Sequence, residues 1–550
     1  MKAPHARASL APLESGGSAG ANLAPDTYLV GCGARAARSA SASVQSMGFK
    51  AWNLLGMAEL GLPVPPAFVL GTRYCRDPQA RAAATGPQIW RPGLQALEQA
   101  TGLRLGNRAR PLLLSVRSGA PVSMPGMMAT LLNVGLCDAT IGGLLRRTGN
   151  PRLVWDAYRR LVASYGEVVA GLPRAEFDAP LLALAAGRDE RELDFADLRE
   201  LTRRYLAIYA QGAGEAFPQE PERQLSGAIG AVLASWQSAK AREYRRLNGL
   251  SDELGTAVTL QAMVFGNAGG GSGAGVGFTR DPTSGEPALY VDFLFDAQGE
   301  DVVSGRRIAH GHDELAQVLP EVWQALGEAA GRLERAFGDM QEFEFTVQEQ
   351  RLFLLQTRSG KRTPLATARI ALDLAAEGVI SAEQARERTR GLDREALART
   401  RIVAVPGASL EPLARAASAS PGVACGRITL GGERAPAGSD AILVRSEAET
   451  DDLSALEDAA GLLTQRGART SHAAVVARQL GKVCLVGCAD LSIDEATRSV
   501  RLGTSRLAEG DLLTLDGNEG ACYAGTVRTE IEYPQALLER LEALRAAGGS

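Results

Sequence analysis

Apolar residues recur along this chain at two spacings, one typical of helices and one typical of strands. Residues 48–60 have the helical period, and the short apolar run at 67–70 predicts a strand. From about 137 to 255 the helical period dominates, with one apolar face formed by Leu225, Ile229, Val232 and Trp236. Helical and β-rich stretches alternate, which predicts an α/β (α+β) protein of several domains.

Residues 340–358 alternate in polarity, as strands do. Glu342, Glu344 and Thr346 would share one face of a first strand. A turn at 348–351 separates this strand from a second one, so the stretch predicts a β-hairpin.

The second strand of this hairpin would bring Gln356 and Arg358 near Glu344 and Glu342. Carboxylate and amide oxygens suit Mg²⁺, which is usually held by one or two carboxylates together with substrate phosphates. A guanidinium group suits phosphate oxygens. The pattern therefore suggests a metal and phosphate site, and the simpler alternative is an exposed polar face.

A β-rich run at 256–265 leads into a glycine-rich stretch at 266–278. Strand, glycine loop and strand together predict a hairpin flap, whose backbone amides could close over a polyphosphate. The stretch has no Gly-Lys-Ser/Thr, so it does not fit the Walker pattern. A flexible linker would look similar.

His472 lies where a helix should begin. The apolar run at 461–464 predicts a buried strand, Thr470 and Ser471 are good N-cap residues, and Gly481 is a natural helix stop. Exposed N–H groups and the helix dipole at that position favour an anion and disfavour a cationic imidazole. A neutral histidine nucleophile that then holds a captured phosphate fits this position. The common alternative is a cap or a surface group.

Two basic residues lie at positions where phosphate contacts are plausible. Arg117 ends a predicted strand at 112–120, where ligands of α/β folds usually bind. Lys50 lies in the first predicted helix. Taken alone, each would more simply be a surface residue. Arg159 and Arg160 are interpreted as a solvated face or as scaffold.

Composition narrows the class of protein. Of the 550 residues, 45% are hydrophobic and 22% charged, and the net charge is −4, so neither a nucleic acid nor an anionic membrane is an expected partner. No apolar run reaches transmembrane length. Seven scattered cysteines indicate reduced thiols and a cytoplasmic location. The Ala-, Ser-, Gly- and Arg-rich start favours a flexible tail over an organelle transit peptide.

Several strings resemble one known family. Thr-Ser-His-Ala-Ala-Val-Val-Ala-Arg at 470–478 resembles the phosphohistidine signature of the phosphoenolpyruvate-utilising enzymes, above all the pyruvate phosphate dikinases. Matching strings are Val-Arg-Ser-Gly-Ala at 116–120, Ser-Met-Pro-Gly-Met-Met at 123–128, Leu-Gln-Thr-Arg at 355–358 and Ala-Ser-Pro-Gly at 419–422. The resemblance covers roughly residues 28–530.

The resemblance implies an ATP-grasp nucleotide-binding domain with a helical insertion, followed by a swivelling α/β phosphohistidine domain. The expected division is a flexible tail at 1–27, the ATP-grasp domain at 28–365 with its helical part at about 137–255, a helical connector at 366–415, the phosphohistidine domain at 416–530 and a C-terminal helix at 531–550.

The resemblance also implies roles for residues. The catalytic residues would be His472 as the phosphohistidine nucleophile, Arg117 and Arg358. Glu344 and Gln356 would hold Mg²⁺, and Thr470 is a possible regulatory phosphorylation site. ATP would contact Lys50, Arg117, Gly270, Gly271, Gly273, Gly275, Glu300, Asp301, Glu342 and Arg358.

The implied function is autophosphorylation of His472 from ATP with Mg²⁺, followed by transfer toward pyruvate or phosphoenolpyruvate. The family's third domain is a (β/α)₈ barrel of about 250 residues. Only about 20 residues follow position 530. We therefore expect the acceptor on a separate barrel subunit. Phosphate is a further expected partner, and a homodimer is possible.

Some positions depart from the family pattern. Phe49, Ala51 and Ala468 replace glycines, and Ala129 replaces an aspartate. An idle, regulatory ATP-binding homologue and a synthase-like phosphotransferase with another acceptor therefore stay open as alternatives.

Overall fold

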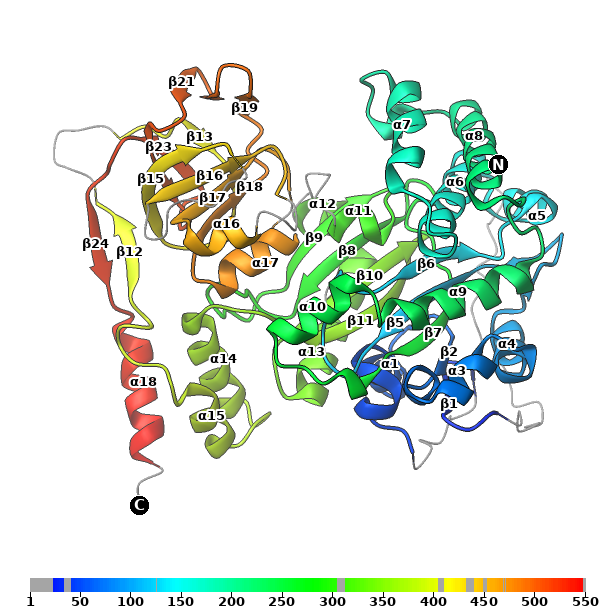
Figure 1. The fold of residues 1–550 in the computed structure, drawn as a ribbon. Coiled ribbons are helices and arrows are strands. Elements are labelled where there is room, and N and C mark those ends of the chain that lie inside the picture. Colours follow the sequence, from blue (N-terminus) through cyan, green and yellow to red (C-terminus); the bar gives the residue numbers. More distant parts are fainter. Residues whose placement is uncertain are drawn as a thin grey trace, which may run out of the picture. The chain divides into compact units, whose positions relative to one another are not determined.

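The computed structural model describes residues 23–33, 41–124, 126–303, 312–403, 410–431, 440–448, 453–467, 469 and 471–547. The chain forms two compact units (Figure 1). Unit 1 comprises Met1–Glu59 and Val64–Met263, and unit 2 comprises Leu60–Pro63 and Val264–Ser550. The stretch 28–365, predicted as one nucleotide-binding domain, thus contributes to both units.

Unit 1 is built on a five-stranded antiparallel sheet with the order β1-β2-β7-β5-β6. Its central strand, β7, follows the helical region, so two distant parts of the sequence meet in this sheet. The strands are β1 Thr27–Val30, β2 Ala67–Leu70, β5 Leu114–Gly119, β6 Thr130–Val134 and β7 Ala257–Ala262.

Helices cover this sheet and extend from it. The helical region predicted at 137–255 is confirmed, and the predicted apolar face of α9 is buried. Before that region lie α1 Val44–Glu59, α2 Arg73–Arg76, α3 Pro78–Ala84, α4 Pro87–Thr101 and the short strands β3 Arg104–Leu105 and β4 Pro111–Leu112. Within it lie α5 Asp138–Thr148, α6 Pro151–Val168, α7 Arg174–Ala185, η1 Glu190–Glu192, α8 Phe195–Ala213, α9 Pro221–Ser235, α10 Ala239–Leu247 and η2 Asp252–Leu254.

A buried ion cluster holds α6 to the segment before α8. Asp156 accepts from Arg159 and lies 3.0 Å from Nε of Arg160, and both arginines also contact Glu190. Arg159 is only 4% exposed, so its interpretation as part of a solvated face is wrong, and its role as scaffold is confirmed. The arginines face inward because the cluster supplies carboxylate partners that sequence periodicity does not reveal.

Asp156→Asn should destabilise unit 1 by about 3 kcal/mol, because it leaves buried arginine charge without its carboxylate. Burial alone would raise the pKa of Asp156, but Arg159, Arg160 and Arg152 outweigh burial and lower it to about 2. A lowered pKa stabilises the fold above the ordinary value of 3.8, and this contribution is lost as the pH falls toward 2. Thermal melts between pH 2 and 7 should therefore show a smaller stability loss in acid for the variant than for the wild type. Parallel pH profiles would contradict this assignment.

Unit 2 begins with a four-stranded antiparallel sheet with the order β11-β10-β8-β9. Phenylalanine rings of β9 and β10 lie over the glycines of β8, and the rings of Phe293 and Phe345 stack 5.8 Å apart. The elements are β8 Gly273–Phe278, β9 Tyr290–Phe295, α11 Gly299–Val303, α12 His312–Val318, α13 Pro320–Phe337, β10 Gln341–Gln348 and β11 Arg351–Ser359.

A second sheet in unit 2 has eight strands, four of which (β15-β16-β17-β18) run parallel. Its elements are β13 Ala414–Arg415, β14 Ala417–Ser420, β15 Val423–Thr429, β16 Ala441–Arg445, α16 Leu453–Asp458, β17 Gly461–Thr464, α17 His472–Gln479, β18 Val483–Val486, β22 Leu512–Asp516 and β23 Ala521–Ala524. A small antiparallel sheet adds β19 Leu491–Asp494, β20 Ser499–Leu502 and β21 Ser505–Ala508.

The segment predicted as a purely helical connector is only partly helical. It contains α14 Pro364–Ala376 and α15 Ala382–Thr389, but Arg399–Ile402 is a strand, β12, which pairs with β24 Thr529–Glu532. Both strands are short and charged, so the local sequence does not predict a strand at either position. Each forms because it pairs with the other, which is distant in the sequence. The predicted C-terminal helix is confirmed as α18 Gln535–Ala546, which packs on α14.

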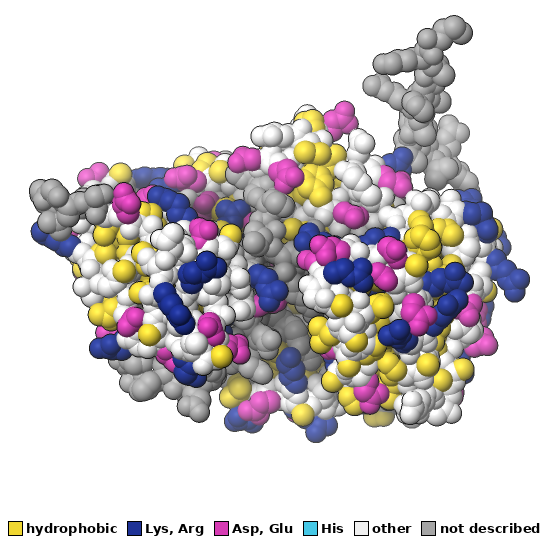
Figure 2. All heavy atoms as spheres, turned by 90° about the horizontal axis from the view of Figure 1, so that it is seen from above, with side chains coloured by type: hydrophobic (Ala, Val, Ile, Leu, Met, Phe, Trp, Pro, Cys, Tyr) yellow, Lys and Arg dark blue, Asp and Glu magenta, His cyan; other side chains and the backbone are white. Residues whose placement is uncertain are grey.

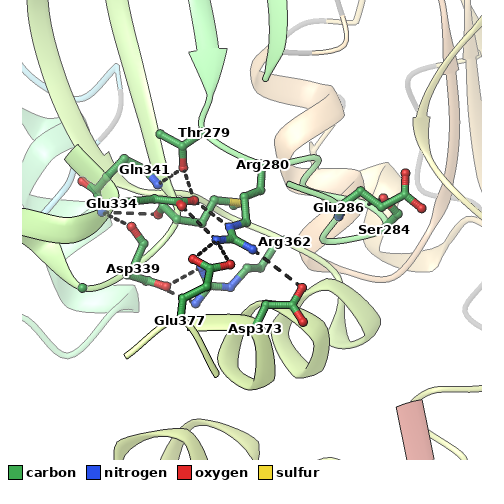
Figure 3. A network of polar contacts seen from close by, with 12 residues as sticks. Thr279, Arg280, Ser284, Glu286, Glu334, Asp339, Gln341, Arg362, Asp373 and Glu377 are labelled. Atoms are coloured by element: carbon green, nitrogen blue, oxygen red, sulfur yellow. Dashed lines mark hydrogen bonds and ion pairs between the residues drawn. The ribbon is translucent and has the colours of Figure 1, made fainter. Parts of the chain in front are cut away.

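A network of ion pairs fastens the end of β8 to the neighbouring helices (Figure 3). Arg280, 3% exposed, bonds Glu334 of α13 at 2.8 Å and Glu377, directly after α14, at 2.9 Å. It also lies 3.6 Å from Asp373, which Arg540 of α18 bonds at 2.7 Å. The network therefore joins the four-stranded sheet to α14 and α18.

The surface is mixed in charge. In Figure 2, basic and acidic side chains are interspersed over the described part of the face shown, as the small net charge leads one to expect. Among the described residues, no helix combines the length and the apolar character needed to cross a membrane.

Candidate active site

His472 is the first residue of α17. The helix starts there because Ser471 is its N-cap, with the Ser471 hydroxyl accepting from the Ala474 N–H. It ends at Gln479 with Leu480 as its C-cap, and Gly481 follows with φ +66°, as predicted. The helix leaves the carboxyl end of β17, in the parallel part of the sheet, which is the usual place for a ligand in such sheets. The backbone N–H groups of the first turn suit an anion at this point.

The hairpin predicted at 340–358 is confirmed. In the register of β10 and β11, Glu342 lies opposite Arg358 and Glu344 lies opposite Gln356. The turn between them places Glu349 and Gln350 at φ +50° and +65°, a two-residue reversal of the kind that matches strand twist. Two carboxylates, an amide and a guanidinium group are thus gathered on adjacent strands.

The Glu342–Arg358 pair is largely buried. Glu342 is 5% exposed, and one of its oxygens accepts from Arg358. Its other oxygen, Oε2, is buried without a hydrogen-bond partner among the described residues. Burial alone would lower the pKa of Arg358, but the carboxylates of Glu342 and Glu344 raise it. Arg358 is therefore held as a cation beside the buried carboxylate of Glu342.

The glycine-rich stretch is not a hairpin flap, so that prediction is wrong. β7 belongs to the sheet of unit 1 and β8 to the sheet of unit 2, and the two strands do not pair. Only residues 266–272 form the loop. The carbonyl of Gly271 accepts from the Gln350 N–H at 2.7 Å, which fixes the loop against the β10–β11 turn.

Two of the four glycines predicted to contact ATP lie in a strand, where their lack of a side chain makes room for packing. Gly273 and Gly275 are strand residues of β8, where an added Cβ would lie 2.1 Å from the ring of Phe293 and 2.5 Å from that of Phe345. Gly270 lies in the loop, and a Cβ there would meet no atom within 4 Å. Gly270 and Gly271 therefore stay candidates for phosphate contact.

In unit 1, Lys50 and Arg117 lie close to one another in the fold. Arg117 is on β5, opposite Thr259 of β7. Lys50 is on α1, and its Cβ is 3.7 Å from the position that a Cβ of Gly119 would take. Lys50 therefore lies over the face of the sheet that Arg117 shares, because residues two apart in a strand point the same way.

The close approach of α1 to β5 depends on Gly48. It has φ +74° and ψ +153°, and an added Cβ would lie 1.9 Å from the Gly119 carbonyl oxygen. The next residue, Phe49, donates its N–H to the Ala120 carbonyl at 2.9 Å. Gly48 was missed as a site residue, although its place directly before the Phe49–Lys50 pair was a usable signal.

For the remaining predicted site residues, the structure gives fewer contacts that bear on their proposed roles. Asp301 accepts from the Gln298 N–H at 3.0 Å and so caps α11. Glu300 lies in the same helix, and its side chain is outside the described residues, as are Ala468 and the predicted phosphorylation site Thr470. Gln298, which prediction did not single out, is 5% exposed, and its amide atoms have no partner among the described residues.

Comparison with known proteins shows what two regions of the chain are similar to. Residues 91–312 match the model of the pyruvate phosphate dikinase AMP/ATP-binding domain, and residues 437–520 match that of the mobile domain of PEP-utilising enzymes. The chain is 40% identical over 506 residues to "Pyruvate, phosphate dikinase" of Clostridium symbiosum, covering 90% of this chain and 58% of that protein. It is 41% identical over 489 residues to "Pyruvate, phosphate dikinase 2" of Zea mays, covering 87% and 55%.

The chain therefore resembles the pyruvate phosphate dikinases in both its AMP/ATP-binding region and its mobile-domain region. It spans a little more than half the length of these relatives. Two of the residues interpreted as departures from the dikinase pattern, Ala51 and Ala129, lie within the described structure. Ala51 is fully buried in α1, and the Ala129 N–H donates to the Ser235 hydroxyl at 3.2 Å.

Proposed function

We propose that this dikinase homologue captures a phosphoryl group from ATP on His472 and carries it as a phosphohistidine. The observation that carries the proposal is the position of His472 as the first residue of α17, directly after its cap, in a region that matches the mobile domain of PEP-utilising enzymes. A helix N-terminus stabilises the negative charge of a bound phosphoryl group. The two carboxylates and Arg358 of the β10–β11 hairpin support a role for this hairpin in binding the phosphates of ATP, the phosphoryl donor.

In the proposed step, an imidazole nitrogen of neutral His472 attacks the β-phosphorus of ATP. The new N–P bond forms as the bond from the β-phosphorus to the oxygen bridging the α-phosphate breaks, and AMP leaves. Orthophosphate then takes the terminal phosphoryl group to give pyrophosphate, so that His472 keeps one phosphoryl group. Lys50, Arg117 and Arg358 would neutralise phosphate charge during this transfer, which depends chiefly on alignment and electrostatics.

We propose that Lys50 and Arg117 contact ATP. We propose the same role for Glu342, Glu300 and Asp301. We also propose phosphate contacts from Gly270, where an added Cβ would meet no atom within 4 Å, and from its neighbour Gly271. The predicted division into a nucleotide-binding domain at 28–365 and a phosphohistidine domain at 416–530 is retained as part of this proposal.

The hairpin residues fit Mg²⁺. Oxygen donors are the ligands Mg²⁺ prefers, and Glu342 Oε2 is a buried carboxylate oxygen without a partner among the described residues. No group of three or more His, Cys, Asp or Glu side chains among the described residues could hold a metal. That suits Mg²⁺, which binds one or two carboxylates and completes its shell with phosphates and water. Glu344 and Gln356 would hold the ion, and the ion would offset phosphate charge.

The acceptor is proposed from the relatives, whose printed names include pyruvate and phosphate. We propose pyruvate as the acceptor and phosphoenolpyruvate as the product, with the acceptor site on a barrel subunit. A cytoplasmic location is proposed because all seven cysteines, each among the described residues, are free.

The proposal is tested by incubating the protein with Mg²⁺ and ATP labelled at either the β- or the γ-phosphate. Both labels should become bound in an acid-labile, base-stable form, with one AMP released per chain. Addition of orthophosphate should release the γ-label as pyrophosphate and leave the β-label bound. Loss of the γ-label as orthophosphate without added phosphate would indicate the synthase-like alternative. ATP binding without bound label would indicate the idle regulator and overturn the proposal.

A further inference from the structure

The strand register of the four-stranded sheet in unit 2 aligns two rows of side chains. Glu344 lies opposite Val276 of β8, and Val276 lies opposite Asp292 of β9. Residues opposite one another on neighbouring strands point to the same face. Asp292 therefore shares a face with Glu344, two strands away, which corresponds to about 10 Å at the usual strand spacing.

The second row runs parallel to the first. Glu342 lies opposite Phe278 of β8, and Phe278 lies opposite Tyr290 of β9. Tyr290 and Asp292 are two residues apart in one strand, so they too share a face. The face that carries the proposed metal and phosphate residues thus extends to β9, where it presents a phenol ring and a buried carboxylate.

Arg469, in the segment that precedes α17, contacts this end of the face. Its Nε and Nη2 donate to Asp292 Oδ1 at 3.1 and 2.9 Å, and Nη2 also donates to the Val291 carbonyl. The guanidinium carbon lies 4.1 Å from the centre of the Tyr290 ring. The Asp292 side chain is only 2% exposed, and that of Arg469 is 24% exposed. The contact is therefore largely shielded from water, unlike an ordinary surface ion pair.

Arg478, near the end of α17, also contacts the backbone of the segment that precedes this helix. Its Nε and Nη2 donate to the Ala419 carbonyl at 3.0 and 2.7 Å, and Nη2 also reaches the Arg469 carbonyl at 3.4 Å. Its guanidinium carbon is 5.9 Å from the centre of the Phe278 ring. Two arginines, three residues before His472 and six residues after it, thus fix the backbone on both sides of His472.

We propose that Arg469 is a positioning residue, which places His472 at the β9 edge of the phosphate-binding face for phosphoryl capture. The inference rests on the proposed function of His472. Three residues of extended chain span at most about 11 Å. The His472 backbone therefore lies within that distance of Arg469, comparable to the separation of β9 from the strand that carries Glu344. Capture requires the reacting atoms to be aligned within about an ångström, so a loosened anchor should cost rate more than nucleotide affinity.

The test compares single-turnover release of AMP with the affinity for a non-hydrolysable ATP analogue. For Arg469→Ala we expect a rate at least roughly tenfold below wild type, with the Kd for the analogue unchanged within about twofold. Arg469→Lys keeps the charge but loses the two-nitrogen contact with Asp292, so its rate should be intermediate. Arg501→Ala, which removes an exposed arginine from the β19–β21 sheet, is the matched control and should behave as wild type.

A variant in which the charges of Arg469 and Asp292 are exchanged provides a second test. Arg469→Asp alone should slow AMP release at least as much as Arg469→Ala, and combination with Asp292→Arg should recover a large part of that loss. A wild-type rate for Arg469→Ala would overturn the inference, as would equal losses of rate and analogue affinity. Failure of the proposed function is distinguishable, because the wild-type protein would then form no labelled intermediate at all.

Discussion

His472→Ala should abolish formation of the labelled intermediate and lower ATP-dependent AMP release by at least roughly a thousandfold. The effect should be this large because a covalent carrier has no substitute. Alanine offers no nitrogen to the β-phosphorus, and water is the only remaining nucleophile. Binding of a non-hydrolysable ATP analogue should stay within about twofold of wild type, since the proposed nucleotide contacts come from other residues.

Two controls separate loss of the nucleophile from loss of the fold. His312→Ala removes a different histidine, at the start of α12, and should label as wild type does. Ser471→Ala removes the cap of α17 and should lower stability by about 1 kcal/mol while leaving labelling measurable. Label that persists on His472→Ala, or label that peptide mapping locates on another residue, would refute His472 as the carrier.

Local patterns were sufficient wherever the deciding interactions were local. Alternation over 340–358 predicted the pairing of Glu344 with Gln356 and of Glu342 with Arg358, because a tight turn leaves few possible registers. The start of α17 at His472 followed from the cap and stop residues around it. These two elements contain the residues on which the proposed chemistry depends.

Prediction failed where distant segments decide the structure. The glycine-rich stretch was interpreted as a flap because strand signals lie on both sides of it, but β7 and β8 pair with other strands in different units. Glycine also serves two purposes that sequence does not separate. In β8 it makes room for phenylalanine rings, whereas Gly269 and Gly270 in the preceding loop have no atom within 4 Å of an added Cβ. The β12–β24 pair joins residues more than a hundred positions apart.

The residues of the candidate site could likewise be predicted only in part from the sequence. Lys50 and Arg117 were selected by resemblance, and the fold then placed them near one another through Gly119. Arg469 gave no signal, because its partner Asp292 is far away in the sequence and looks like an ordinary strand residue. A contact between a buried carboxylate and a distant arginine can be recognised only when the three-dimensional arrangement of the strands is known.

Gly48→Ala should destabilise unit 1 by about 3 kcal/mol or more and lower its melting temperature by roughly 10 °C. Gly48 combines φ +74° with ψ +153°, a conformation that side chains strongly disfavour, and the new Cβ would lie 1.9 Å from the Gly119 carbonyl oxygen. Relief requires α1 to move away from β5. That movement would shift Lys50, so affinity for ATP should fall even at temperatures where the variant stays folded.

Comparison with other glycine positions isolates the cause of this effect. Gly142→Ala, in α5, places its Cβ 3.6 Å from the flexible end of Arg146 and should be neutral or slightly stabilising. Phe49→Gly restores a glycine that the family usually has beside Lys50, but it leaves the Gly48 contact unchanged. If Gly48→Ala melts and binds ATP as wild type does, the close packing of α1 on β5 does not position Lys50. If ATP affinity falls in Gly48→Ala but not in Gly142→Ala, Gly48 acts on the nucleotide site through the backbone, by allowing α1 to pack closely on β5.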